Sequence, residues 1–229
     1  MNFQISGMSS MATRQILADL IGRYEERTKY RVVIHSMGGV EAARRIRAGE
    51  PSDVIILASN VMEQLEAEGH ILFGSRAHFA RSGIAMAVRS GAVQPSIDDE
   101  ESVKQATLRA RKVCYSTGPS GDHLRRLWQR WGILDLISER AVQAPAGVPV
   151  GTIIAQGEAD LGFQQLSELL HAPGIDIVGP LPPEIQALTV FSAGLSSSSS
   201  QLRQAGDLVA YLASPEAEAV KRRHGMEPA

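Results

Sequence analysis

Short apolar runs typical of strands alternate with amphipathic helix patterns from the beginning of this chain of 229 residues. Strands are predicted over residues 3–5, 31–35 and 53–57, and helices over residues 11–27, 40–48 and 60–68. In the first helix the spacing of Ile16, Leu20 and Tyr24 places them on one face. Strands that alternate with helices at this spacing form a parallel sheet covered by helices on both faces. The chain is therefore predicted to be an α/β protein.

The middle of the chain is predicted to form a second lobe. Further strands are expected over residues 84–88, 112–115, 160–163, 175–178 and 185–191. We expect residues 1–80 with 192–229 to form lobe 1, and residues 81–191, including the hinge strands, to form lobe 2. Each lobe is predicted to be a mainly parallel sheet flanked by helices, and two crossover strands join the lobes.

Four turns combine small residues with hydroxyl or other polar neighbours. They span residues 6–10, 36–39, 116–121 and 146–151, and each is predicted to carry a strand into a helix. The start of a helix offers unpaired backbone N–H groups and the positive end of the helix dipole. Several such starts in one cleft would bind a small anion without a metal or a prosthetic group, so we expect neither.

Composition excludes several classes of function. The net charge of −2 and the aromatic content of 5% do not favour nucleic-acid binding. The single cysteine, Cys114, is expected in a buried strand, and no spacing of His and Cys residues predicts a metal site. No apolar run is long enough for a membrane span, and no signal peptide precedes residue 3. We expect a cytoplasmic protein, or a periplasmic one if a leader has been removed.

Several segments resemble the molybdate-binding proteins of the type 2 periplasmic solute-binding superfamily. They are residues 24–34, the run ARRIRAGEPSDVIILA at 43–58, the run GEADLG at 157–162 and the run SPEA at 214–217 followed by His224 and Gly225. The resemblance extends over nearly the whole chain. It implies a two-lobe type 2 fold that closes by hinge motion on a ligand held between the lobes.

The resemblance also implies where a ligand would bind. Those proteins hold a tetrahedral oxyanion with serine hydroxyls, backbone amides and a tyrosine hydroxyl. Ser9 or Ser10 matches the first serine, but Gly38 and Gly39 fall near the second, and the tyrosine position falls at Gln164 or Gln165. An amide in place of the phenol adds little for a tetrahedral oxyanion, so we favour a carboxylate ligand over molybdate.

The turn over residues 116–121 supplies three hydroxyls before a helix, which is enough to bind a carboxylate. A desolvated polyanion should also meet a cation, and Arg81 lies beside the predicted hinge. The predicted ligand-binding residues are Ser9, Ser10, Gly38, Gly39, Arg81, Ser82, Ser116, Thr117, Ser120, Val148, Gln164 and Gln165.

Three functions remain open from the sequence. The first is a monomeric solute-binding protein for a di- or tricarboxylate, with an ABC transporter permease as its partner if it is exported. The second is a cofactor-independent isomerase of a tricarboxylate such as aconitate, because the aconitate isomerases look like solute-binding proteins of this type. The third is a protein that binds a molybdate- or tungstate-type oxyanion. The catalytic base of the enzyme is unknown, with Glu41 and His123 as candidates.

Overall fold

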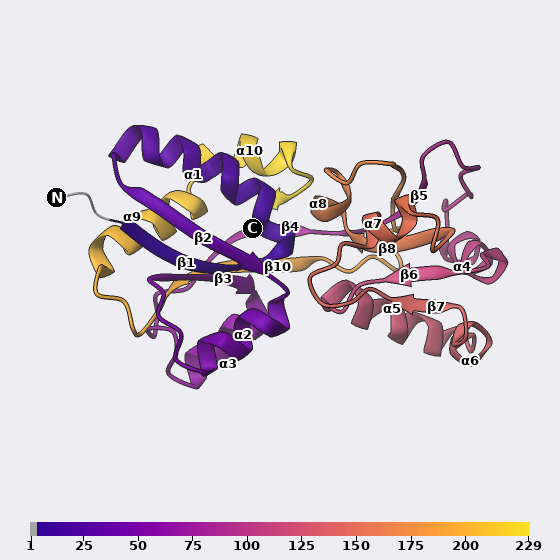
Figure 1. The fold of residues 1–229 in the computed structure, drawn as a ribbon, viewed down its shortest axis with the longest axis horizontal. Helices are drawn as coiled ribbons and strands as arrows, with labels where there is room; N and C mark the ends of the chain where they lie inside the picture. Colours follow the sequence, from indigo (N-terminus) through magenta and orange to yellow (C-terminus); the bar gives the residue numbers. More distant parts are fainter. Residues whose placement is uncertain (1–3) are drawn as a thin grey trace. The chain divides into compact units, whose positions relative to one another are not determined.

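The computed structural model describes residues 4–229 and divides into two compact units (Figure 1). Unit 1 runs up to Arg81 and resumes at Thr189–Ala229, whereas unit 2 is Ser82–Leu188. The chain therefore passes from one unit to the other twice. The boundaries predicted from the sequence lie after residues 80 and 191, and Phe3 of the first predicted strand lies outside the described residues.

Unit 1 is built on a sheet of six strands in the order β11-β4-β10-β3-β1-β2. Its elements are β1 (Gln4–Ser10), η1 (Met11–Thr13), α1 (Arg14–Thr28), β2 (Arg31–Met37), α2 (Gly39–Arg47), β3 (Val54–Ala58), α3 (Ser59–Ala67), β4 (Ala77–Ser82), β10 (Thr189–Leu195), α9 (Leu202–Ala213), η2 (Pro215–Ala217), α10 (Glu218–Arg223) and β11 (Glu227–Pro228). In sequence, β4 ends at Ser82, one residue past the division between the units.

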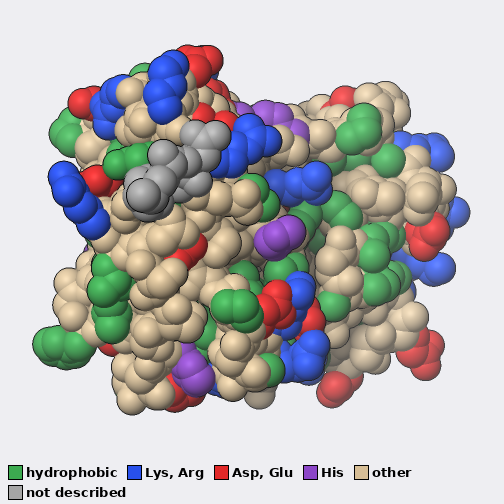
Figure 2. Space-filling view, turned by 60° about the vertical axis from the view of Figure 1, so that its left-hand side comes forward, with side chains coloured by type: hydrophobic (Ala, Val, Ile, Leu, Met, Phe, Trp, Pro, Cys, Tyr) green, Lys and Arg blue, Asp and Glu red, His purple; other side chains and the backbone are tan. Residues whose placement is uncertain are grey.

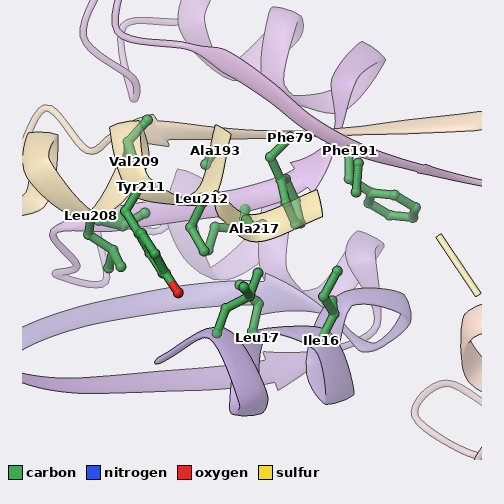
Figure 3. Close-up of a cluster of buried hydrophobic side chains, with 14 of the residues drawn as sticks. Ile16, Leu17, Phe79, Phe191, Ala193, Leu208, Val209, Tyr211, Leu212 and Ala217 are labelled. Atoms are coloured by element: carbon green, nitrogen blue, oxygen red, sulfur yellow. The ribbon is translucent and has the colours of Figure 1, made fainter. Parts of the chain in front are cut away.

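The buried residues of unit 1 lie on both faces of this sheet because alternate strand residues face opposite sides. In β3, Val54 and Ile56 join one hydrophobic cluster, and Ile55 joins the other. The first cluster packs α1 and α9 against strand residues such as Phe79 and Phe191 (Figure 3). The buried face of α1 carries Ile16, Leu17, Leu20 and Tyr24, as the sequence pattern predicts.

Unit 2 contains a sheet of five strands in the order β7-β6-β8-β5-β9. Its elements are β5 (Ile84–Arg89), α4 (Glu100–Arg109), β6 (Val113–Tyr115), α5 (Pro119–Arg130), α6 (Leu134–Ile137), β7 (Ala141–Gln143), α7 (Val150–Ala155), β8 (Leu161–Gln165), α8 (Leu166–Leu169) and β9 (Ile175–Pro180). Along β5, Met86 packs into the cluster that contains Trp128, whereas Ala85 and Ala87 pack into the cluster under α7.

The prediction of mainly parallel sheets is corrected to mixed sheets. In unit 1, β1 pairs in parallel with β2 and β3, but β10 runs antiparallel to β3. In unit 2, β6 pairs in parallel with β7 and β8, but β5 runs antiparallel to β8 and β9. The parallel pairs are joined through helices, while β5 and β10 follow the two passages between units. Consecutive strands joined by a helix become parallel neighbours, but a strand that comes from the other unit has no such constraint on its direction.

The predicted turn over residues 6–10 is wrong, since these residues complete β1. Gly7 explains the error, because glycine is typical of turns but here serves close packing within a strand. A Cβ atom at Gly7 would lie 2.8 Å from the Val54 carbonyl oxygen and 2.5 Å from Ile34 Cδ1. The hydroxyl residues Ser9 and Ser10 therefore lie at the end of the strand.

Charged side chains of both signs are interspersed on the face seen in Figure 2. No helix in the described part of the chain is long and apolar enough to cross a membrane.

Candidate functional site

In unit 2, the turn over residues 116–121 and Gln164 meet at one edge of the sheet. Strands β6 and β8 are parallel, with Tyr115 paired to Phe163, so their carboxyl ends lie side by side. The residues that follow, Ser116 and Gln164, are therefore neighbours in the register. The structure brings these two predicted site residues together because both strands run in the same direction.

The turn over residues 116–121 is closed by its own side chains. Ser116 Oγ and Ser120 Oγ lie 2.8 Å apart, and the backbone N–H of Gly118 donates to Ser116 Oγ over 3.4 Å. Helix α5 begins at Pro119 without a side-chain cap. The backbone N–H groups of Ser120 and Gly121 therefore have no carbonyl acceptor within the helix. Thr117 is exposed and Ser120 is buried. The turn thus offers hydroxyl and backbone donors at the strand edge.

Gln164 makes a hydrogen-bonded bridge that the sequence did not predict. Its Oε1 accepts the N–H of Val150 over 3.0 Å, and its Nε2 donates to Glu168 Oε1 over 2.8 Å. Because an N–H must meet the carbonyl oxygen of the amide, the Val150 contact also fixes which end of the amide faces Glu168. Both ends of the Gln164 amide are engaged within unit 2.

Glu168 has an unusual environment for a carboxyl group. The side chain is only partly exposed, and burial raises its pKa to about 7 against the opposing effect of the Gln164 hydrogen bond. Glu168 is not among the residues predicted from the sequence, because a glutamate in a short helix after a strand has no distinguishing local pattern. The spacing of four residues from Gln164 was the one sequence feature that could have drawn attention to Glu168.

The predicted pair Gln164 and Gln165 separates in the structure. Successive residues of β8 face opposite sides of the sheet, and Gln164 lies on the side of α7. Both side chains are buried. Val148, from the predicted fourth turn, is exposed and lies two residues before α7 begins at Val150.

In unit 1, Ser9 and Ser36 meet at the carboxyl ends of β1 and β2. They are register partners, and their hydroxyl oxygens lie 2.8 Å apart. Ser10 instead caps η1, where its Oγ accepts the Ala12 N–H over 3.4 Å. Ser36 thus supplies a hydroxyl one strand away from Ser9, close in sequence to the glycine pair.

Gly38 and Gly39 form the start of α2. Gly38 is the N-cap residue, and it has no side chain that could accept a hydrogen bond from the first helical N–H groups. A Cβ atom at Gly39 would have no heavy atom within 4 Å, so packing within the protein does not require glycine there. Space beside the first helical N–H groups is therefore open to solvent or a ligand.

A second hydroxyl cluster in unit 1 was not predicted. Ser59 follows β3 directly, and its Oγ lies 2.6 Å from Ser192 Oγ and 3.2 Å from His78 Nδ1. His78 Nδ1 also lies 2.8 Å from Ser192 Oγ. Ser59 could have been found from the sequence as a hydroxyl residue at the end of a parallel strand. His78 and Ser192 could not, because β4 and β10 bring them to Ser59 from distant parts of the chain.

The two predicted site residues at the first passage between units have partners of their own. Arg81 Nε donates to Glu227 Oε2 over 3.0 Å, across the antiparallel pair of β4 and β11. Its charge is already compensated by a carboxylate. Ser82 is buried, and its Oγ donates to Ser167 Oγ over 3.4 Å, one residue before Glu168.

Neither catalytic candidate from the sequence is placed as a free base. Glu41 accepts two hydrogen bonds from Arg44, which hold the pKa of its carboxyl below the usual value, so it is a weak proton acceptor at neutral pH. His123 Nε2 lies 2.7 Å from the Ile185 carbonyl oxygen, to which it can only donate. Cys114 is buried, and burial raises its pKa to about 12, which keeps the thiol protonated.

Among residues 4–229 no three His, Cys, Asp or Glu side chains are grouped closely enough to hold a metal ion. The hydroxyl and amide groups at the strand ends are donors suited to an anion.

Two mixed α/β units with helices on both faces define the architecture of the periplasmic binding proteins. The chain belongs to the bacterial extracellular solute-binding protein family, whose model matches residues 5–227. It is 37% identical over 227 residues to the aconitate isomerase of a Pseudomonas species. The alignment covers 96% of this chain and 86% of the relative.

Two solved structures share the fold. The periplasmic molybdate-binding protein of Azotobacter vinelandii has a TM-score of 0.82 at 24% identity, covering 97% of this chain and 98% of that one. The sulfate-binding protein SubI of Mycobacterium tuberculosis has a TM-score of 0.77 at 13% identity, covering 100% of this chain and 88% of that one. The predicted resemblance to molybdate-binding proteins is confirmed.

Proposed function

We propose that this protein is a cofactor-independent isomerase of an unsaturated tricarboxylate of the aconitate type. The observation that carries the proposal is the 37% identity to an aconitate isomerase over nearly the whole chain. This reverses the order in which the sequence analysis placed the two functions, where ligand binding without turnover came first.

The reaction would need few parts. A base removes a proton from the methylene carbon, and the electron pair spreads over the three-carbon unit into the adjoining carboxylate. A proton is then returned to the carbon at the other end of that unit, so that the double bond has moved and no electron acceptor is used. The protein must hold carboxylates, stabilise the developing negative charge and carry one proton.

The hydroxyl-rich strand ends support carboxylate binding. In unit 2, Ser116 and Thr117 precede α5 and Ser120 lies in its first turn, while in unit 1 Ser9 and Ser36 lie at the ends of β1 and β2. Hydroxyls and N–H groups at helix starts form charge-assisted hydrogen bonds to carboxylates. The joint use of both sets by one ligand stays a prediction.

A second candidate is a solute-binding protein without turnover, serving an ABC transporter. Its support is the family itself, whose model describes extracellular solute-binding proteins. A molybdate-type oxyanion is a less suitable ligand in unit 2, because the Gln164 amide is engaged by Val150 and Glu168.

The experiment that tests the proposal follows cis- and trans-aconitate by ultraviolet absorbance with purified protein. We expect conversion in both directions toward the same equilibrium mixture. A parallel thermal-shift screen uses citrate, isocitrate, tricarballylate, sulfate and molybdate, since a tight ligand raises the melting temperature. A shift with tricarboxylates but no conversion would favour the solute-binding protein, and a shift with molybdate alone would overturn both carboxylate functions.

A further inference from the structure

We propose that Glu168 is the group that takes and returns the proton in this isomerisation, and that Gln164 positions it. The inference rests on the proposed function. It assigns the base that the sequence could not name, and it places that base in unit 2.

The carboxylate of Glu168 is held by one oxygen and open at the other. Oε1 accepts the hydrogen bond from Gln164 Nε2 over 2.8 Å, which fixes the direction of the carboxylate. Oε2 accepts no hydrogen bond from the described residues, and the Glu168 side chain is partly exposed. A proton carrier needs this arrangement, with an anchored side chain and an accessible reactive atom.

The anchoring continues into the sheet. Gln164 is held by the Val150 N–H over 3.0 Å, and Val150 packs against β8 only because position 162 is glycine. A Cβ atom at Gly162 would lie 2.6 Å from Val150 Cγ1. Since Gln164 lies at the carboxyl end of β8 beside Ser116, Glu168 is tethered at the same edge as the hydroxyl turn that we propose binds a carboxylate.

No salt bridge to Glu168 forms within residues 4–229, and the largest influence on its pKa is burial. The elements that pack most closely against α8 are β5, β8 and α7. Helix α7 and strand β8 carry no charged residue, and β5 carries only Arg89, at the end away from Ile84. From β4 comes the neutral hydroxyl of Ser82, which contacts Ser167. Burial without a cation raises the pKa of Glu168 to about 7, so both protonation states are populated at neutral pH, as a group that must accept and donate requires.

The proton balance is closed by this one group. Ionised Glu168 accepts the methylene proton at Oε2 while the carbon–hydrogen bond breaks and its electron pair enters the allylic system. Neutral Glu168 then returns the proton to the other terminal carbon and is ionised again. No oxidant, reductant or second co-reactant is needed.

The test compares wild-type protein with Glu168→Gln, which keeps the size of the side chain and its hydrogen-bonding capacity. We expect kcat for aconitate conversion to fall by about 100-fold or more, the usual contribution of a positioned general base. Binding of tricarballylate, measured by calorimetry, should remain within about threefold, because the change leaves the hydroxyl turn intact. The matched control is Glu139→Gln, an exposed glutamate of the same unit, which should retain full activity.

Gln164→Leu tests the positioning role. Loss of the hydrogen bond to ionised Glu168 should raise the pKa that governs kcat and lower kcat more than it changes KM. In the wild type, kcat should fall as the pH drops through about 7 or slightly above, since a bound trianion raises the pKa of Glu168 further. This profile needs no variant, so it decides the matter if Glu168→Gln does not fold.

The outcomes separate the two proposals. A wild-type protein without isomerase activity would overturn the proposed function and this inference with it. An active wild type with an equally active Glu168→Gln variant, or with a kcat that is constant between about pH 5.5 and 8.5, would overturn the role of Glu168 alone.

Discussion

Gly121 lies directly against the backbone of Ser116 at the start of α5. A Cβ atom at Gly121 would come within 1.8 Å of the Ser116 carbonyl oxygen, far inside any allowed contact. The third residue of α5 is therefore folded onto the end of β6 through the absence of a side chain. This contact holds the Ser116 and Ser120 hydroxyls beside each other.

Replacing Gly121 by alanine should separate α5 from the turn. We expect Gly121→Ala to lower the free energy of unfolding by about 2 to 4 kcal/mol, because the clash is with backbone and no side chain can move away. Urea denaturation measures the change. Gly206→Ala, in α9 with no heavy atom within 4 Å of the added Cβ, is the control and should be neutral or stabilising. Equal stability of the two variants would contradict the contact.

Removing hydroxyls from the turn should weaken ligand binding. Ser116→Ala combined with Thr117→Val is expected to reduce tricarboxylate affinity by a few kcal/mol, since each charge-assisted hydrogen bond contributes about 1.5–3 kcal/mol. Calorimetric titration with tricarballylate measures the loss. Ser138→Ala, whose exposed hydroxyl donates to the Asp135 carbonyl oxygen outside the turn, should bind as the wild type does. Unchanged affinity in the double variant would exclude the turn from the binding site.

Glu168 should make stability depend on pH. Its pKa is raised from 4.5 to about 7 in the folded protein, so its ionisation is less favourable in the folded than in the unfolded chain. The free energy of unfolding should therefore fall as the pH rises from about 4.5 to about 7, by as much as about 3 kcal/mol. Glu168→Gln should remove this fall and be more stable than the wild type at pH 8, with little difference at pH 4.5.

Denaturation of both proteins at these two pH values measures the effect. A stability difference that is the same at both would show that Glu168 does not carry a raised pKa.

Gly39 offers a test of where the ligand approaches unit 1. Alanine has room there and favours a helix over glycine, so Gly39→Ala should raise the free energy of unfolding by as much as about 1 kcal/mol. If a carboxylate approaches the start of α2, the new methyl group should also lower its affinity about tenfold, by steric exclusion. Denaturation and calorimetry on the same variant give both numbers. Higher stability with unchanged affinity would place the ligand elsewhere.

Local patterns were sufficient for most of the fold. The buried stripe of α1 and the alternation of Met86 with Ala85 and Ala87 in β5 depend only on neighbours along the chain. The resemblance to solute-binding proteins could also be recognised from contiguous segments, and the family model confirms it. The prediction of a turn at residues 6–10 was wrong because Gly7 is not a turn residue. It lies in a strand where the backbone of Val54, on the neighbouring strand, leaves no room for a side chain.

The sequence by itself determined the α/β class, the alternation of its elements and the hydroxyl-rich strand ends, because periodicity and turn composition are properties of adjacent residues. Only the tertiary structure decided what those residues contact. Gln164 joins Glu168 to Val150, Ser59 contacts both His78 and Ser192, and Arg81 is paired with Glu227. Desolvation and hydrogen bonding depend on groups that folding brings from distant parts of the chain, so the raised pKa of Glu168 has no counterpart in local sequence.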